Sequence, residues 1–61
     1  MKNQLRKKRL ELNLTQMEMS QKLEIPYRTY YQYERGTRIP NVITGIKMAE
    51  ALNSDVKKLF S

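Results

Sequence analysis

The stretch TQMEMSQKLEIPYRTYYQYERG, which covers residues 15–36, constrains the fold more than any other part of this chain. A helical pattern covers residues 15–23, and Thr15 and Glu18 supply a capping box at its start. A tight break follows, after which Pro26 marks a second helix start, because proline is tolerated only in the first turn of a helix. This stretch therefore predicts two short helices joined by a tight turn.

The second of these helices has two different faces. It is predicted to end at Gly36, because glycine is the residue type expected just after a helix. Tyr30 and Tyr33 lie three residues apart on one face, and we expect both in the core. The side chains that point elsewhere are those of Tyr27, Arg28, Thr29, Tyr31 and Gln32. A pair of short helices at a steep angle is how many proteins offer a helix to the DNA major groove, so this second face is a candidate for DNA contact.

Arg28 and Gln32 have the chemistry needed to read bases, and their spacing of four residues places them on one helix face. Arginine can bond to guanine O6 and N7 together, and glutamine to adenine N6 and N7. Ordinary surface polarity is the alternative interpretation of this pair. Tyr27 and Tyr31 are spaced in the same way, and their rings and hydroxyls can contact thymine methyls, bases or phosphates. The alternative for one of these tyrosines is packing against the preceding helix.

The rest of the chain predicts three more helices and no strands, so that residues 1–61 form one all-α domain of five helices. These three helices are expected over residues 2–12, 41–52 and 55–60. Asn13 can adopt the left-handed conformation that ends the first of them, and Asp55 can cap the last. The residues expected to be buried in these helices are Leu5, Leu12, Val42, Ile46, Ala49, Leu52, Val56, Leu59 and Phe60.

The net charge of +6 is unevenly distributed along the chain. Residues 1–38 hold nine basic and four acidic side chains, a net of +5, whereas residues 39–61 hold three basic and two acidic ones, a net of +1. A basic half of this kind is the footprint expected of a protein that binds a polyanion. A merely basic, soluble surface is the alternative, and binding of the cationic helix near the N-terminus to anionic membrane is another.

Histidine and cysteine are both absent from the chain. Their absence removes the commonest general base, the commonest metal ligand and any thiol nucleophile. The chain is therefore a poor candidate for an enzyme, and no catalytic residue, metal, cofactor or small-molecule ligand is predicted. No apolar run is long enough for a signal peptide or a membrane span, and the composition fits a cytoplasmic protein.

The chain contains the stretches LRKKRLELNLTQ, MSQKLEIP, YYQYERGTRIPN and MAEALNSDVKKLF. At these spacings they resemble the Cro- and phage-repressor-like helix-turn-helix family, also called XRE-type, over residues 5–60. The resemblance implies a compact five-helix fold and a helix that enters the DNA major groove. It also implies sequence-specific binding of double-stranded DNA by a transcription regulator, with repression as the expected effect.

The resemblance implies roles for individual residues as well. Base contacts are expected from Tyr27, Arg28, Thr29, Tyr31 and Gln32. Phosphate contacts are expected from Thr15, Gln16, Arg35, Thr37, Arg38 and Asn41. Arg9 and Glu34 match a pair that forms a partly buried salt bridge in some members. Three residues depart from the family pattern: Glu24 stands where glycine is frequent, Pro26 stands where a Ser or Thr cap is usual, and Gly45 stands where a larger apolar residue is common.

One unit of this kind offers few base contacts, so we expect a homodimer on a pseudo-palindromic operator. The helices over residues 41–52 and 55–60 are expected to supply the dimer contact. Gly45 costs about 1 kcal/mol in a helix interior, which indicates a close approach of another backbone, and Ile43 falls off the core stripe. The alternative functions are an antitoxin-like or accessory protein-interaction module with secondary DNA binding, and a non-specific nucleic-acid binder.

Overall fold

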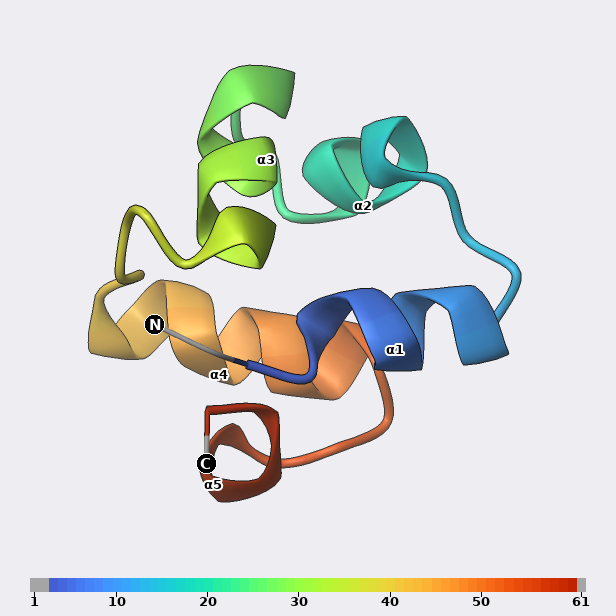
Figure 1. Ribbon diagram of the computed structural model, residues 1–61, viewed down its shortest axis with the longest axis vertical. Helices are drawn as coiled ribbons and strands as arrows, with labels where there is room; N and C mark the ends of the chain where they lie inside the picture. Colours follow the sequence, from blue (N-terminus) through green and yellow to red (C-terminus); the bar gives the residue numbers. More distant parts are fainter. Residues whose placement is uncertain (1–2, 61) are drawn as a thin grey trace.

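The computed structural model describes residues 3–60, and over this range the chain forms five α-helices and no strands (Figure 1). The helices are α1 (Leu5–Glu11), α2 (Gln16–Lys22), α3 (Tyr27–Arg35), α4 (Val42–Ala51) and α5 (Val56–Leu59). The predicted all-α fold is confirmed. None of the helices within this range is long and apolar enough to cross a membrane.

Side-chain caps set the starts of α2, α4 and α5. The predicted start of the first helix at Lys2 lies outside the described residues, and α1 begins at Leu5, whose N–H donates to Asn3 Oδ1 at 3.0 Å. The capping box at α2 is confirmed, because Thr15 Oγ1 accepts from the Glu18 N–H at 3.0 Å and the Glu18 carboxylate accepts from the Thr15 N–H at 2.9 Å. Asn13 adopts the predicted left-handed conformation, with φ of 56°.

The turn between α2 and α3 contains Glu24, which stands where the family frequently has glycine. Glu24 has φ of 55°, a conformation that L-residues other than glycine adopt only at a cost. The N–H of Ile25 donates to the Ser20 carbonyl at 3.0 Å, which closes the end of α2. Pro26 is the N-cap of α3, one residue before the helix begins, and it provides no side-chain cap bond.

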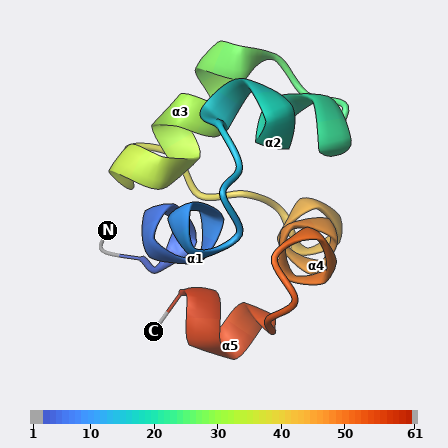
Figure 2. The ribbon, with the colours of Figure 1, turned by 90° about the vertical axis from the view of Figure 1, so that its right-hand side faces the viewer.

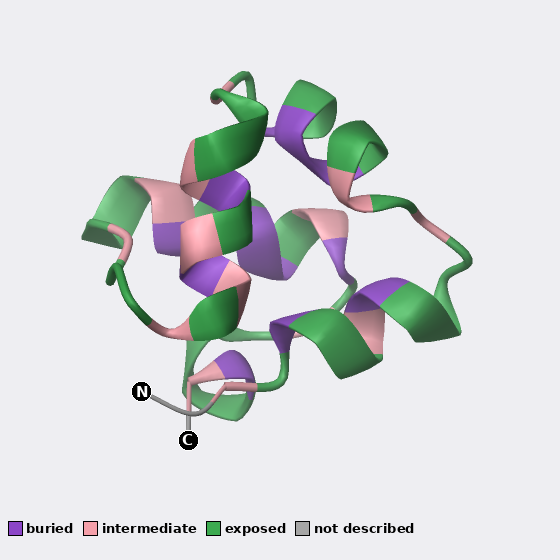
Figure 3. Ribbon diagram, turned by 45° about the horizontal axis from the view of Figure 1, so that its top comes forward, coloured by how far each residue is buried: buried purple, intermediate pink, exposed green. Residues whose placement is uncertain are grey.

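The core lies where the five helices meet. The α2–α3 pair covers one side of the molecule and α5 lies on the opposite side, with α1 and α4 between them (Figures 1 and 2). Each helix turns its buried residues inward and leaves its outer face exposed (Figure 3). The buried hydrophobic residues are Leu5, Met19, Leu23, Tyr30, Tyr33, Met48, Ala49, Leu52 and Leu59. Both tyrosines of α3 are thus core residues, as predicted.

The predicted buried face of α4 is wrong in part. Ala49 and Leu52 are buried, but Val42 and Ile46 are 78% and 48% exposed. The buried stripe of α4 consists of Gly45, Met48, Ala49 and the capping residue Leu52. The helix carries apolar residues on two faces, so its periodicity could not show which face the neighbouring helices cover.

Two other residues expected in the core are also exposed. Leu12 follows the last residue of α1 and is 39% exposed, because the chain leaves the helix there and no longer faces the core. Val56 is 41% exposed at the first position of α5. Leu59 is fully buried and Phe60 packs partly buried against the core, so the end of α5 anchors this helix as predicted.

Candidate nucleic-acid interface

The orientation of α3 follows from the burial of Tyr30 and Tyr33 on its inner side. With these residues fixed in the core, the outer side of the helix presents Arg28 together with Tyr27 and Tyr31, whose exposed fractions are 43% and 38%. Gln32 and Thr29 are half-buried, since both lie closer to the packed side of the helix. These five residues, predicted as base contacts, are called the α3 face below.

The start of α2 meets the start of α3 through two side chains. The hydroxyl of Tyr27 donates to Gln16 Oε1 at 2.9 Å. Gln16 Nε2 in turn donates to Glu34 Oε1 at 3.2 Å. The residue predicted to bind phosphate and the first residue predicted to touch a base are therefore in direct contact, and both are connected to the interior.

An ion pair between α1 and α3 anchors these contacts. Arg9 Nε donates to Glu34 Oε2 at 2.6 Å and Arg9 Nη2 donates to Glu34 Oε1 at 3.3 Å. Only 8% of the Arg9 side chain and 4% of the Glu34 side chain are exposed. The remaining donor Arg9 Nη1 reaches the Leu14 carbonyl at 2.8 Å, so the guanidinium also holds the loop before α2.

Burial and hydrogen bonding act in opposite directions on Glu34. Burial by itself raises the pKa of this carboxyl, but the hydrogen bond from Arg9 and the neighbouring donors outweigh burial, and the pKa lies below its ordinary value. The hydrogen bond to Glu34 raises the pKa of Arg9. Both groups are therefore charged at neutral pH, and the carboxylate can only accept hydrogen bonds.

Three other predicted phosphate-binding residues, Arg35, Thr37 and Arg38, lie at the C-terminal end of α3 and just beyond it. Arg35 Nη1 donates to the hydroxyl of Tyr31 at 3.0 Å, and its guanidinium lies 5.6 Å from the centre of that ring. In the loop that follows, the Thr37 hydroxyl donates to the Gln32 carbonyl at 3.3 Å and the Arg38 guanidinium lies 6.0 Å from the Tyr33 ring. The loop is therefore held against the helix that it follows.

Thr15 and Asn41, also predicted at phosphates, both serve as helix N-caps. Asn41 Oδ1 accepts from the Thr44 N–H at 2.8 Å, as Thr15 Oγ1 does from Glu18 at the start of α2. Their capping oxygens are occupied in this way, and the Asn41 amide nitrogen and the Thr15 hydroxyl hydrogen remain as the donors for a phosphate.

Sequence reasoning did not predict the links that Gln16 makes with Tyr27 and with Glu34. The residues are 11 and 18 positions apart and belong to two helices. No local spacing encodes a contact of this kind, because it depends on the angle at which α2 and α3 cross. The only signal in the sequence is the chemistry of the amide, which can donate and accept at once.

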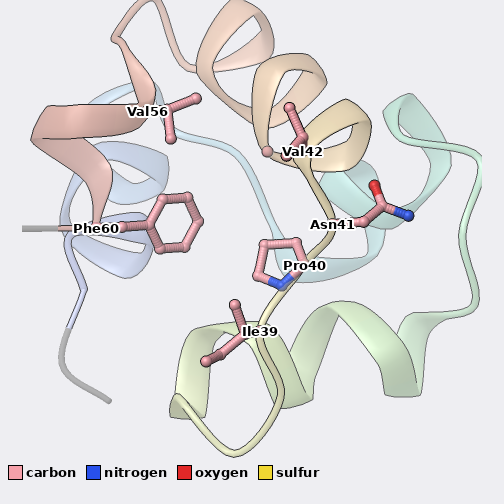
Figure 4. A pocket seen from close by; sticks show the side chains of 7 residues that line it. Ile39, Pro40, Asn41, Val42, Val56 and Phe60 are labelled. Atoms are coloured by element: carbon pink, nitrogen blue, oxygen red, sulfur yellow. The ribbon is translucent and has the colours of Figure 1, made fainter.

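An apolar hollow lies between the α3–α4 loop, the start of α4 and α5 (Figure 4). Its volume is about 250 Å³, and it is lined by Ile39, Pro40, Asn41, Val42, Gly45, Val56 and Phe60. Three exposed apolar side chains, Ile39, Val42 and Val56, line it, and α4 also carries the exposed Ile43 and Ile46. These five residues are called the α4 patch below. Ile39, Val42 and Ile43 are each more than two-thirds exposed, at 69%, 78% and 68%.

The steep pair α2–α3, with a polar and cationic outer face on the second helix, defines a helix-turn-helix protein. A helix-turn-helix family model matches residues 5–59, and the chain belongs to this family of DNA-binding proteins. It is also similar to a protein of Bacillus subtilis strain 168 named as an uncharacterized HTH-type transcriptional regulator, YqaF. The two sequences are 40% identical over 55 residues, which cover 90% of this chain and 72% of the relative. The resemblance inferred from the sequence is confirmed.

Proposed function

We propose that this chain is a sequence-specific transcription regulator, acting in the cytoplasm as a repressor, in which α3 enters the major groove of double-stranded DNA. The observation that carries the proposal is the α3 face, which is polar and cationic on a helix fixed to the core by Tyr30 and Tyr33. Arg28 and Gln32 read base edges, and Tyr27, Thr29 and Tyr31 complete the contact. Residues 1–61 act as one domain, and no reaction or cofactor belongs to this function.

The residues at the two ends of α3 position the helix by binding phosphates. Gln16 and Thr15 do so at the start of α2, next to the start of α3, and Arg35, Thr37, Arg38 and Asn41 do so at the end of α3 and beyond it. Phosphate contacts fix orientation without reading sequence, whereas contacts with base edges specify it. The charge distribution supports this assignment, because residues 1–38 carry a net charge of +5.

The test is selection of duplexes from a random pool, followed by affinity measurements with variants. Arg28→Ala should weaken binding to the selected sequence by about 1–3 kcal/mol and relax the preference at one base pair. Lys57→Ala is the matched control, since it removes a positive charge that is also exposed, from α5. If Arg28→Ala binds the selected and scrambled duplexes as wild type does, base reading by Arg28 is wrong. Repression is tested by placing the selected sequence over a promoter, and a rise in transcription would contradict it.

We further propose that the chain binds DNA as a homodimer in which the α4 patch of one copy meets that of a second. The patch contains both a hollow and projecting side chains, so it can complement itself across a two-fold axis. An apolar hollow with exposed apolar side chains at its rim indicates an interaction site on a small protein. Residues 39–61 carry a net charge of only +1, so two copies meet there with little repulsion.

Gly45 supports a second copy as the occupant of this surface. A Cβ atom added to Gly45 would lie 3.9 Å from Val56 Cγ2, an ordinary contact, so packing within one copy does not require glycine. Glycine in a helix interior costs about 0.5–1 kcal/mol relative to alanine. Gly45 is buried but lines the hollow, so its missing side chain leaves room there for a group of the second copy. The described Cα atoms span 23 by 22 by 19 Å, so two touching copies have the size to place their α3 helices about 34 Å apart, one DNA turn.

Two substitutions test self-association separately from the stability of the fold. Ile43→Glu should abolish self-association in sedimentation experiments while its thermal melt stays close to that of wild type, because Ile43 is 68% exposed. Gly45→Ala should raise the free energy of unfolding of the monomer by about 0.5–1 kcal/mol and yet weaken association. A wild type that is monomeric at high micromolar concentration, and also on its selected DNA, would overturn the homodimer.

A further inference from the structure

Three hydrogen-bonded links run from the buried ion pair to the exposed start of α3. Arg9 donates to Glu34, Gln16 Nε2 donates to Glu34 Oε1, and the Tyr27 hydroxyl donates to Gln16 Oε1. The distances at these links are 2.6, 3.2 and 2.9 Å. The row begins at side chains that are almost fully buried and ends at a tyrosine that is 43% exposed.

The direction of every donor in this row is fixed by the carboxylate. Glu34 is ionised beside Arg9, and an ionised carboxylate can only accept. Gln16 must therefore turn its NH₂ group toward Glu34, which leaves its carbonyl oxygen toward Tyr27. A carbonyl oxygen also only accepts, so the single hydroxyl hydrogen of Tyr27 points inward, to Gln16.

A tyrosine hydroxyl with its hydrogen committed in this way can only accept a hydrogen bond from DNA. In the major groove the donors are the exocyclic amino groups, N6 of adenine and N4 of cytosine. Guanine O6 and N7 and thymine O4 are acceptors, and each would face the lone pairs of the Tyr27 oxygen. The buried charge of Glu34 thus determines what the exposed hydroxyl can recognise.

We propose that Tyr27 is a specificity-determining residue that accepts a hydrogen bond from the amino group of an adenine or cytosine in the major groove, and disfavours guanine and thymine on that strand. The inference rests on the proposed function, since it names what one residue of the α3 face reads. Gln16 acts on this choice through Tyr27 and is a positioning residue for it, in addition to its phosphate contact.

The experiment uses the duplex selected by the wild-type chain and varies one base pair at a time. At the pair facing Tyr27, replacing adenine by purine, or cytosine by pyrimidin-2-one, removes only the amino group. We expect this replacement to weaken wild-type binding about ten-fold, within the range for one mismatched pair. Tyr27→Phe keeps the ring but cannot accept a hydrogen bond from the amino group. In this variant the same base replacement should therefore change affinity less than about two-fold.

A second variant tests whether the hydrogen bond that the Tyr27 hydroxyl donates to Gln16 restricts this hydroxyl to accepting from DNA. Gln16→Leu leaves Tyr27 intact but removes the carbonyl to which it donates, so the hydroxyl can turn and donate to DNA. Overall affinity should fall with the lost phosphate contact, while the ratio between amino and amino-free bases at this pair should drop to about two or less. Thermal melts of both variants establish that they are folded.

The outcomes separate this inference from the proposed function. If no sequence is selected from the random pool, sequence-specific DNA binding, and with it the proposed function, is contradicted. A selected sequence that Tyr27→Phe binds more weakly by one uniform factor, with base preferences intact, would make Tyr27 only a support for Gln16 and overturn the inference. A preference for guanine or thymine at the pair affected by Tyr27→Phe would overturn it as well.

Discussion

Glu34 connects three helices through one carboxylate. It accepts from Arg9 of α1 and from Gln16 of α2, and it belongs to α3 itself. An exposed ion pair contributes under about 1 kcal/mol, whereas removing one partner of a buried pair costs about 3–5 kcal/mol because the other charge stays buried. The Arg9–Glu34 pair lies at the edge of the core with both side chains largely covered, so its loss should fall between these limits.

Glu34→Gln should lower the free energy of unfolding at pH 7 by about 1–4 kcal/mol. The pKa of Glu34 is lowered in the folded chain, so its carboxylate stabilises the fold above the unfolded-state value near 4.5 and loses this effect as pH falls through the folded-state pKa. The difference between wild type and variant should therefore shrink as the pH falls below 4.5 and through the folded-state pKa. Denaturant titrations at several pH values measure it, with Glu50→Gln as an exposed control. Indistinguishable curves at pH 7 would contradict the stabilising role.

The turn between α2 and α3 is locally strained, and the packing of the two helices stabilises it. Glu24 holds a positive φ of 55° without glycine, and Pro26 caps α3 without a side-chain bond. Packing of α2 against α3 over-determines the turn, because Met19 and Leu23 of one side and Tyr30 of the other are buried together. Tertiary contacts therefore offset a local cost of about 1 kcal/mol.

Glu24→Gly should stabilise the chain by about 0.5–1 kcal/mol, because glycine adopts positive φ without steric cost and this gain exceeds its greater freedom when unfolded. For a domain of this size that corresponds to a rise in melting temperature of roughly 2–8 °C. Glu24→Ala is the matched control, since it removes the same charge but keeps the Cβ atom. An equal rise in both variants would attribute the effect to charge rather than to backbone strain.

At the scale of the whole molecule, the positive charge is concentrated in one part of the chain and the most exposed apolar side chains lie in the other. The half that contains α2 and α3 carries a net charge of +5, whereas the α4 patch lies in a half with a net charge of +1. A dimer built through the α4 patch brings two basic halves to one duplex and doubles the number of phosphate contacts.

The salt dependence of DNA binding should therefore show whether one copy or two contact the duplex. The logarithm of the association constant falls with the logarithm of salt concentration by about 0.9 for each phosphate contacted. Wild type on the full selected site should show about twice the slope of Ile43→Glu on a half-site. Equal slopes in a series of fluorescence anisotropy titrations would show that one copy makes all the contacts, and would contradict the two-copy arrangement.

The sequence determined the helices and their ends, because these depend on neighbouring residues. The capping box of Thr15 and Glu18, the left-handed residue Asn13 and the terminal Gly36 were all readable from local chemistry. The burial of Tyr30 and Tyr33 agreed with their spacing of three residues on one face of α3, although Tyr27 and Tyr31 form a second aromatic pair on that helix. The family pattern also pointed to Arg9 and Glu34, which the structure places 2.6 Å apart.

Tertiary structure alone decided which face of α4 is buried and how Gln16 joins Tyr27 to Glu34. In α4 both candidate faces are apolar, so hydrophobic periodicity is satisfied by either, and only the positions of α1, α3 and α5 exclude one of them. The contacts of Gln16 depend on the crossing of α2 and α3, which fixes three side chains within hydrogen-bond distance. Local sequence sets the elements, but the relative placement of elements far apart in the chain is set by how their surfaces pack together.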